Sequence, residues 1–526
     1  MSNQPTENAG GFRSRSKAAS KNSQASRGAG RSQQSRSKSN RGSGAGKRDQ
    51  QRRDGSQPNT QRRPQHRDKR AGGAKPLPDG LRGIFIDVDL ARAVAFDVIF
   101  RANEEGTYAN LALPKLLNQE GLKRRDAAFA TELTYGTLRN QGVIDAVLAA
   151  CSSRPLDSIH PGVLAALRLG TYQLLYTRVE PHAAVDTSVR IVADIGQGQA
   201  KGFTNAILRS VTSKTPEQWL ETLEPAGEIA ALAFRHAHPE WIARSFAKIL
   251  GLAELEGALD ADSQRPKVHL VARPGEISAE ELALITGGEE GQYSPYAVYL
   301  DSGNPGELDP VREGLAAVQD EGSQLIARSL VEAPVTGEDH GRWLDLCAGP
   351  GGKAALLGCL ARIDGATVDA IEIQEHRARL IEKSVNGLPV RVHHADGRDS
   401  GLEPGFDRVL VDAPCSGLGA LRRRPEARWR KQESDIAELN KLQKQLLSSA
   451  IELTRSGGVV VYSTCSPDLR ETRGIVDYAL ENFPVEELDA HALVPNLPDA
   501  GEDKSIQMWP HRHGTDAMFF AVLRKK

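Results

Sequence analysis

Two short cysteine peptides hold the residue types of this chain best suited to covalent chemistry. Residues 412–417 read DAPCSG and residues 463–467 read STCSP, and each peptide follows an apolar run typical of a buried strand. A thiolate that adds to C6 of a cytosine makes C5 nucleophilic enough to attack a sulfonium methyl, and this chemistry needs a cysteine and a nearby acid. Asp412 stands three residues before Cys415. The peptides therefore predict a thiolate that attacks a nucleobase.

The remaining cysteines fit a simpler interpretation. The chain has five cysteines, and none has CxxC spacing. An odd number spread over 526 residues favours neither a disulfide framework nor a zinc cluster. We expect Cys151 and Cys359 to be small buried hydrophobes, no metal site, and a reduced cytoplasmic protein.

Alternating strand and helix patterns must position the two peptides. Apolar runs at 343–346, 367–373, 390–393, 409–411 and 459–462 are separated by helical stretches, as in a parallel α/β sheet. One helix begins after Ser434, a candidate N-cap, and we expect Gly457 and Gly458 to end it. In such sheets ligands bind beyond the carboxyl ends of the strands. Both cysteine peptides follow strands at that edge.

A glycine-rich loop at 347–353 (CAGPGGK) follows the first strand of this sheet. A P-loop would need glycine at 347 and Ser or Thr at 354, but Cys347 and Ala354 stand there. A dinucleotide fingerprint fits the glycines, with Glu372 at the end of the next strand. An S-adenosylmethionine site uses the same geometry, and Pro350 lacks the N–H that a pyrophosphate-binding loop would use. The loop alone leaves the last two alternatives open, and the cysteines favour S-adenosylmethionine.

Charge and periodicity divide the rest of the chain. Residues 1–75 carry 19 Lys and Arg against 4 Asp and Glu, within a near-neutral chain of net charge −1. This composition predicts a disordered tail over 1–82, which either binds polyanions or only aids solubility. Helical stripes predict an all-α bundle over 86–214, and short β-rich pieces predict a small α+β linking module over 230–325. The α/β Rossmann-like domain then spans 326–526, and no apolar run is long enough for a membrane span.

A basic segment at 421–431 (LRRRPEARWRK) follows the first cysteine peptide. Arginines with one tryptophan, Trp429, would suit phosphate contacts and stacking with an extruded base, whereas a solvated charged loop is the simpler alternative. Its position favours RNA contact. We expect His511 and His513 to be structural or RNA-facing, because they lack a ligand cluster.

These motifs together resemble the Sun (Fmu) family of RNA cytosine-5 methyltransferases. The resemblance is carried by residues 345–353 (DLCAGPGGK), 396–399 (DGRD), 412–417, 463–466 and 509–516, with 319–324 (QDEGSQ) entering the domain. Residues 131–139 (TELTYGTLR), 167–174 (LRLGTYQL) and 203–209 (FTNAILR) are similar to the NusB-like RNA-binding domain. This pairing is typical of the bacterial small-subunit ribosomal RNA methyltransferases of type B. It covers roughly 86–526 and leaves the tail unexplained.

The resemblance implies a role for each site residue. Cys465 would be the nucleophile, Cys415 would assist breakdown of the covalent adduct, and Asp412 would face the N3/N4 edge of cytosine. Glu372 would bind the ribose and Asp396 would lie near the adenine. The implied cofactor-binding residues are Cys347, Ala348, Gly349, Pro350, Gly351, Gly352, Lys353, Glu372, Asp396 and Asp412. Gly349 stands where many relatives carry alanine, a change expected to loosen the turn without removing a contact.

The function implied is a monomeric, cytoplasmic enzyme that transfers a methyl group from S-adenosylmethionine to C5 of a cytosine in small-subunit ribosomal RNA. Transfer RNA is the alternative substrate, because closely similar motifs act on it. An NAD-dependent oxidoreductase would share the glycine loop but would leave both cysteine peptides unused. An inert RNA-binding scaffold would account for the bundle and the tail, but not for Cys465, Cys415 and Asp412.

Overall fold

A computed structural model of the chain describes residues 80–301 and 303–526. Most of the predicted basic tail therefore lies outside the described residues. The first described element, η1 (Gly80–Gly83), falls at the end of that predicted tail. Leu81 of η1 is buried, and its backbone N–H donates to Glu120 Oε1 at 3.0 Å. The described residues, 80–301 and 303–526, belong to one compact unit.

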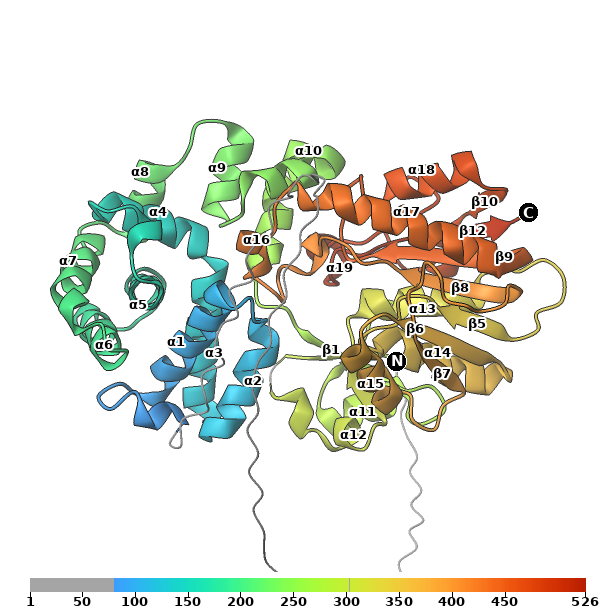
Figure 1. Ribbon diagram of the computed structural model, residues 1–526, viewed down its shortest axis with the longest axis horizontal. Helices are drawn as coiled ribbons and strands as arrows, with labels where there is room; N and C mark the ends of the chain where they lie inside the picture. The colour runs from blue at the N-terminus through green and yellow to red at the C-terminus, as the bar shows by residue number, and fades with distance from the viewer. Residues whose placement is uncertain (1–79, 302) are drawn as a thin grey trace, which may run out of the picture. The chain divides into compact units, whose positions relative to one another are not determined.

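The first part of this unit is helical, as the sequence predicts. Ala91, Val94, Ala95, Val98 and Ile99 form the predicted apolar stripe, and all five are buried in one core. Asp89 caps this helix by accepting a hydrogen bond from the Arg92 N–H at 3.0 Å. The helices, shown in blue to green in Figure 1, are α1 (Leu90–Glu104), α2 (Ala109–Glu120), α3 (Arg124–Arg139), α4 (Gln141–Cys151), α5 (Pro161–Tyr176), α6 (Pro181–Asp194) and α7 (Lys201–Val211).

Three further helices lead to a small antiparallel sheet. They are α8 (Pro216–Leu223), α9 (Glu228–Arg235) and α10 (Glu240–Ser263), the last of which is interrupted at Gly251 with φ 67°. The described sheet has the order β2-β3-β1-β4, with β1 (Val268–Ala272), β2 (Glu289–Glu290), β3 (Ala297–Leu300) and β4 (Ala316–Val318). Helices α11 (Ala279–Thr286) and α12 (Asp309–Arg312) accompany it. The β-rich pieces predicted around residues 268–271 and 296–300 are therefore strands.

The remaining residues form an α/β domain. Its eight-stranded sheet, counted over the described residues, has the order β10-β12-β9-β8-β5-β6-β7, with β11 paired to β12. The strands are β5 (Arg342–Asp345), β6 (Thr367–Glu372), β7 (Val390–His394), β8 (Phe406–Asp412), β9 (Thr454–Thr464), β10 (Val485–Leu488), β11 (Ile506–Gln507) and β12 (Phe519–Lys525). Strands β5 to β9 pair in parallel, and β12 pairs antiparallel with β9 and β10. All five predicted parallel strands are present.

Both faces of this sheet are buried, as expected for parallel strands covered by helices. Along β9, Val459 and Val461 belong to one core cluster, while Val460 and Tyr462 belong to another. Leu325 and Leu356, from the first two helices of this domain, belong to the first of these clusters, and Leu446, from a later helix, belongs to the second. Figure 1 shows these helices around the yellow to red sheet. They are α13 (Glu321–Glu332), α14 (Gly352–Asp364), α15 (Glu375–Ser384), α17 (Asp435–Leu453) and α18 (Arg473–Asn482). The short helices α16 (Ala427–Arg430) and α19 (Pro510–His513) lie apart from this layer.

The end of α17 differs from the prediction. The helix stops at Leu453, and Gly457 and Gly458 lie inside strand β9. Gly457 has φ 77°, and a Cβ there would lie 2.4 Å from the Thr336 carbonyl oxygen. The glycines therefore allow a bend and a close backbone approach at the start of the strand. Ser434 occupies the N-cap position, but its side chain makes no capping hydrogen bond.

Within the described residues, none of the helices is both long and apolar enough to cross a membrane.

Candidate active site

Strand register brings the two cysteine peptides together. In the parallel pair β8–β9, Asp412 lies opposite Ser463, so the chain leaves both strands at the same edge. The Asp412 carboxylate accepts a hydrogen bond from Ser463 Oγ at 3.1 Å, and the Ala413 N–H donates to the Ser463 carbonyl at 2.9 Å. These bonds link the two strand ends. Cys415 and Cys465 follow directly from them.

The two thiols form a pair. Cys415 Sγ and Cys465 Sγ lie 3.4 Å apart, and both side chains are half-buried. The hydrogen bond from Cys415 lowers the pKa of Cys465, and Arg424 and Lys353 lower it further against the opposing effects of burial and Asp412. The same hydrogen bond, together with burial, raises the pKa of Cys415 well above its ordinary value. The geometry thus favours a thiolate at Cys465 beside a thiol at Cys415.

A lysine and two carboxyl groups lie next to this pair. Lys353 Nζ donates to Asp412 Oδ2 at 2.8 Å. Burial lowers the pKa of Lys353, but the Asp412 carboxylate more than offsets this, so the lysine stays charged. Asp345, at the end of β5, is fully buried, and burial followed by the nearby Asp412 charge raises its pKa to about 7. Lys353 therefore orients the Asp412 carboxylate, while Asp345 is neutral below that pH.

The glycine-rich loop connects β5 to α14 and faces the end of β6. Gly351 has φ 113°, a conformation that side-chain-bearing residues rarely adopt. A Cβ at Gly349 would lie 1.9 Å from Glu372 Oε2 and 2.7 Å from Arg377 Nε. Gly349 therefore permits close contact between the loop and the Glu372–Arg377 pair, and an alanine there would displace those side chains.

The two predicted ribose- and adenine-side acids lie on this edge in different surroundings. Glu372 is 5% exposed, accepts a hydrogen bond from the Gln374 N–H at 2.9 Å and pairs with Arg377 at 3.4 Å. Asp396 is held by Arg398, whose hydrogen bond lowers the pKa of that carboxyl. Both side chains thus accept hydrogen bonds at this edge of the sheet.

One cavity joins these groups. It has a volume of about 860 Å³, within the usual range for small-molecule sites. Both thiols and Asp412 line it, as do Cys347, Gly349, Pro350, Glu372 and Asp396 from the predicted cofactor set. Ala348, Gly351, Gly352 and Lys353 are not among its lining residues. Among the described residues, no group of three or more His, Cys, Asp and Glu side chains is arranged to hold a metal ion.

A buried polar network that the sequence did not indicate supports the Pro-Cys loop. Glu471 Oε1 accepts the Ser416 N–H at 2.8 Å, and Glu471 also accepts a hydrogen bond from the Ser416 hydroxyl. Gln443 of α17 donates to the Pro414 carbonyl at 2.9 Å and to Glu471 at 3.0 Å. These residues hold both sides of Cys415. Neither belongs to a local motif, so only the tertiary structure reveals their role.

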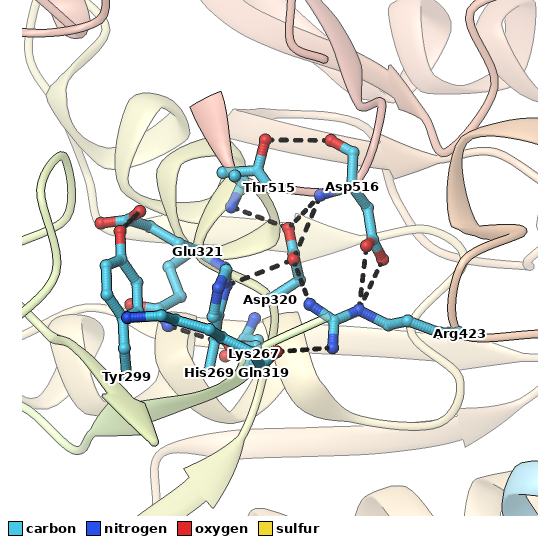
Figure 2. A network of polar contacts seen from close by, with 12 residues as sticks. Lys267, His269, Tyr299, Gln319, Asp320, Glu321, Arg423, Thr515 and Asp516 are labelled. Atoms are coloured by element: carbon cyan, nitrogen blue, oxygen red, sulfur yellow. Dashed lines mark hydrogen bonds and ion pairs between the residues drawn. The ribbon is translucent and has the colours of Figure 1, made fainter. Parts of the chain in front are cut away.

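Most arginines of the basic segment 421–431 have internal partners, so only part of the segment is free for the predicted RNA contact. Arg423 donates to Asp320 at 2.7 Å and to Asp516 at 2.9 Å, as Figure 2 shows. Arg422 is buried and donates to Asp516 at 2.7 Å. Burial opposes ionisation of Asp320, but His269, Arg423 and Arg422 hold its pKa below the ordinary value. These arginines therefore tie the segment to the small sheet and to the chain end.

Arg428 and Trp429 are also internal. The Arg428 side chain has no exposed surface and donates to the backbone of Asp262 and Ala237 and to Ser263 Oγ. Trp429 Nε1 donates to the Leu138 carbonyl in α3 at 2.8 Å. A Cβ on Gly142 would lie 2.3 Å from the Trp429 ring, so the indole packs against α4. Trp429 thus anchors the segment to the helical region and is not a free stacking surface.

The two histidines of the C-terminal motif are structural. His513 Nδ1 accepts the Trp509 N–H at 2.9 Å, and its Nε2 lies 2.7 Å from the Pro498 carbonyl. His511 Nε2 lies 3.1 Å from Glu254. Of the cysteines predicted to be inert, Cys359 is fully buried, and Cys151 is half-buried against the helical core.

Comparison with known families agrees with this architecture. Residues 332–524 match the family described as 16S rRNA methyltransferase RsmB/F, and residues 89–213 match the NusB family. Putative methyltransferases from two Mycobacterium tuberculosis strains, CDC 1551 / Oshkosh and H37Rv, are each 55% identical over 444 residues, covering 83% of this chain and 97% of the relative. The probable ribosomal RNA small subunit methyltransferase B of Bacillus subtilis (strain 168) is 30% identical, covering 83% and 98%. The solved structure of PH0851 shares the fold, with a TM-score of 0.72 at 23% identity over 86% of this chain and all of that one.

Fold, site and relatives together define an S-adenosylmethionine-dependent RNA methyltransferase. The chain belongs to the RsmB/F family and carries an N-terminal NusB-like domain. The predicted resemblance is therefore confirmed, as is the multidomain fold. The family also excludes the oxidoreductase and inert-scaffold hypotheses.

Proposed function

We propose that this enzyme methylates C5 of a cytosine in small-subunit ribosomal RNA through a covalent adduct between Cys465 and C6. The observation that carries the proposal is the thiol pair, with sulfur atoms 3.4 Å apart in the same cavity as Asp412. Methylation of an exocyclic nitrogen or a ribose oxygen would not need a nucleophilic thiol. Addition to C6 does, because C5 is otherwise too weak a nucleophile.

The cavity suits S-adenosylmethionine in size and in donor set. We assign its binding to the loop 347–353, together with Glu372, Asp396 and Asp412. Among these, the buried Glu372 carboxylate suits ribose hydroxyls, and Asp396 lies on the neighbouring strand end. When bound, the cofactor supplies an electrophilic methyl group on a positively charged sulfur. The close Gly349–Glu372 approach keeps this wall free of side-chain bulk.

Different side chains of this protein act in successive steps of the reaction. The Cys465 thiolate forms the S–C6 bond, and the C5–C6 π electrons become available at C5. Asp412, held by Lys353 and Ser463, hydrogen-bonds to the N3/N4 edge and stabilises the adduct. After methylation, Cys415 assists removal of the C5 proton once its own thiol proton has passed to solvent. The electrons of that C–H bond then restore the C5–C6 double bond, and the S–C6 bond breaks to release Cys465.

The substrate assignment rests on named relatives and on the NusB-like domain. Several Salmonella relatives named ribosomal RNA small subunit methyltransferase B are 32% identical over 447 residues, covering 98% of the relative. Transfer RNA remains the alternative substrate. The expectation of a monomeric, cytoplasmic enzyme accompanies the ribosomal assignment and is checked by light scattering and cell fractionation.

Methyl transfer from labelled S-adenosylmethionine to unmodified small-subunit ribosomal RNA tests the proposal. The wild type should transfer label to C5, read out by nuclease digestion and chromatography. Cys415→Ala should accumulate a protein–RNA adduct that survives denaturing electrophoresis, and Cys465→Ala should give neither product nor adduct. Cys359→Ser serves as a thiol control outside the cavity. Transfer to another atom, or an adduct that persists in Cys465→Ala, would overturn the mechanism, and activity on transfer RNA alone would overturn the substrate.

A further inference from the structure

A tyrosine from the NusB-like domain lies at the catalytic cavity. Tyr108 immediately precedes α2 and lines the same cavity as Cys415 and Cys465. Its side chain is 45% exposed, although it is a large aromatic residue, and it makes no capping hydrogen bond to the helix. The exposed ring therefore forms part of the wall of the cavity that holds both thiols.

Two arginines of the 421–431 segment lie over this ring. The guanidinium carbons of Arg424 and Arg430 are each 5.3 Å from the Tyr108 ring centroid. Arg430 is half-buried and pairs with Glu426 at 3.5 Å. Arg424 is exposed and, within the described residues, its side chain has no ion-pair or hydrogen-bond partner. Lys431, which also lines the cavity, has none there either. Thus two cations of this segment remain available to a ligand, in contrast to Arg422, Arg423 and Arg428.

Contacts between the two domains hold the tyrosine in place. The Ala109 N–H, next to Tyr108, donates to Glu426 Oε1 at 3.2 Å. Trp429 is bonded to α3, as described above, so the same segment is attached to the helical domain on both sides of Arg428. A Cβ on Gly106 would lie 3.6 Å from the Arg430 guanidinium, so the loop that leads to Tyr108 passes close to Arg430. The ring is therefore preorganised, and ordering it on binding requires little entropy.

We propose that Tyr108, Arg424 and Lys431 bind the nucleotide next to the target cytosine, so that the NusB-like domain contributes directly to the active site. The proposal rests on the proposed RNA methylation and adds a positioning surface to it. Aromatic rings and guanidinium planes both stack on unpaired bases, and exposed cations contact phosphates. When the target cytosine is extruded into the cavity, the adjacent base loses its stacking partner. Stacking of that base on Tyr108 or Arg424 would replace the lost interaction.

Equilibrium binding of unmodified small-subunit ribosomal RNA to the full chain tests this surface. Tyr108→Ala should raise the Kd by about tenfold, within the range for loss of one base–aromatic stack, while Tyr108→Phe should bind like the wild type. Arg424→Ala should lower the slope of log K against log salt by about 0.7, as for one lost phosphate contact on single-stranded RNA. Leu111→Ala is the matched control, because Leu111 is 67% exposed on the same helix and does not line the cavity.

A double-mutant cycle then separates stacking from a general loss of fold. Once the methylated cytosine is located, short RNAs carry an abasic residue on its 5′ or 3′ side. The wild type should lose affinity for one of these two RNAs, and Tyr108→Ala should not discriminate between them. Equal losses in both proteins, or a Tyr108→Ala variant that binds the transcript like Leu111→Ala, would overturn the proposal.

The two proposals fail in different ways. Absence of cytosine-5 methylation by the wild type would overturn the proposed function, whatever the binding data show. Unchanged binding and unchanged KM for RNA in Tyr108→Ala, with normal wild-type methylation, would overturn only the role of this surface. The wild type, Tyr108→Ala and Leu111→Ala should bind S-adenosylmethionine with the same affinity, since neither Tyr108 nor Leu111 belongs to the residues assigned to the cofactor.

Discussion

The strand-end cysteine peptides and the basic segment that follows them make an informative contrast. Both stand out in the sequence as candidate functional regions, and only five residues lie between Cys415 and Leu421. The cysteine peptides lie in the cavity, as their strands dictate. Most of the arginines in 421–431 instead face aspartates from other parts of the chain. A reactive residue at a strand end is thus a stronger predictor of function than a cluster of charges.

The largest expected effect concerns the strand ends. Asp412→Asn should reduce the rate of methyl transfer by about 10²- to 10⁴-fold, the usual contribution of a positioned acid or base. Single-turnover rates at saturating RNA measure this loss. Asp399→Asn, an acid outside the catalytic cavity, is the control. If both variants retained the wild-type rate, Asp412 would have no part in the chemistry.

The next expected effect concerns the free energy of unfolding and a residue inside the basic segment. Arg428→Ala should lower the free energy of unfolding by about 3–5 kcal/mol, because it leaves the buried Asp262 without its cation. Arg424→Ala, four residues earlier and exposed, should change it by no more than about 0.5 kcal/mol. Urea denaturation followed by circular dichroism compares the two. Equal losses of unfolding free energy in the two variants would contradict the distinction between arginines with internal partners and arginines available to a ligand.

Asp345 gives the strand-end region a pH-dependent stability. Its pKa is about 7 in the folded protein against an ordinary value of 3.8, so the unfolded chain ionises first and stability falls as pH rises through that interval. The full interval corresponds to at most about 4 kcal/mol. Asp345→Asn should remove this dependence. Its Tm should therefore fall less than that of the wild type between pH 5 and pH 8, as calorimetry would measure; parallel profiles would show that Asp345 is ionised throughout.

The smallest effect links the two regions. The rate of adduct formation should rise with pH as Cys465 ionises, with a midpoint below the ordinary thiol value, since Cys415 and Arg424 both lower its pKa. Arg424→Gln should shift that midpoint upward at saturating RNA, and Lys441→Gln should leave it unchanged because Lys441 pairs with Glu438. Rapid-quench rates across the pH range provide the measurement. A midpoint identical in all three proteins would mean that the segment has no electrostatic effect on the nucleophile.

Much of the fold was predictable because its signals are local. The five parallel strands, the helical stripe at 91–99 and the strand at 268–271 all follow from apolar periodicity. The end of α17 was predicted wrongly, because Gly457 and Gly458 lie inside β9 and allow close backbone approaches to Thr336 and Asp407, respectively, rather than ending the helix. Nothing within α17 itself carries that information.

The candidate site divides in the same way. Cys465, Cys415 and Asp412 could be named in advance, since a parallel strand order places their peptides at one edge. The supporting Glu471 and Gln443 could not, because their partners at 414–416 lie 29 to 55 residues away in the chain. The ion-pair partners of the arginines could not be predicted from the sequence either. Arg422 and Arg423 pair with aspartates more than 90 residues distant.

The amino-acid sequence by itself determined where the reactive groups stand, because strand periodicity and parallel pairing carry Cys415, Cys465 and Asp412 to the same edge. Only the tertiary structure decided which charges are free to bind a ligand. A guanidinium is satisfied by whichever carboxylate folding brings within hydrogen-bonding distance, and in this chain those carboxylates come from distant parts of the sequence. The placement of Tyr108 beside the thiols has the same origin, since it depends on contacts between helices and a loop that are more than 300 residues apart.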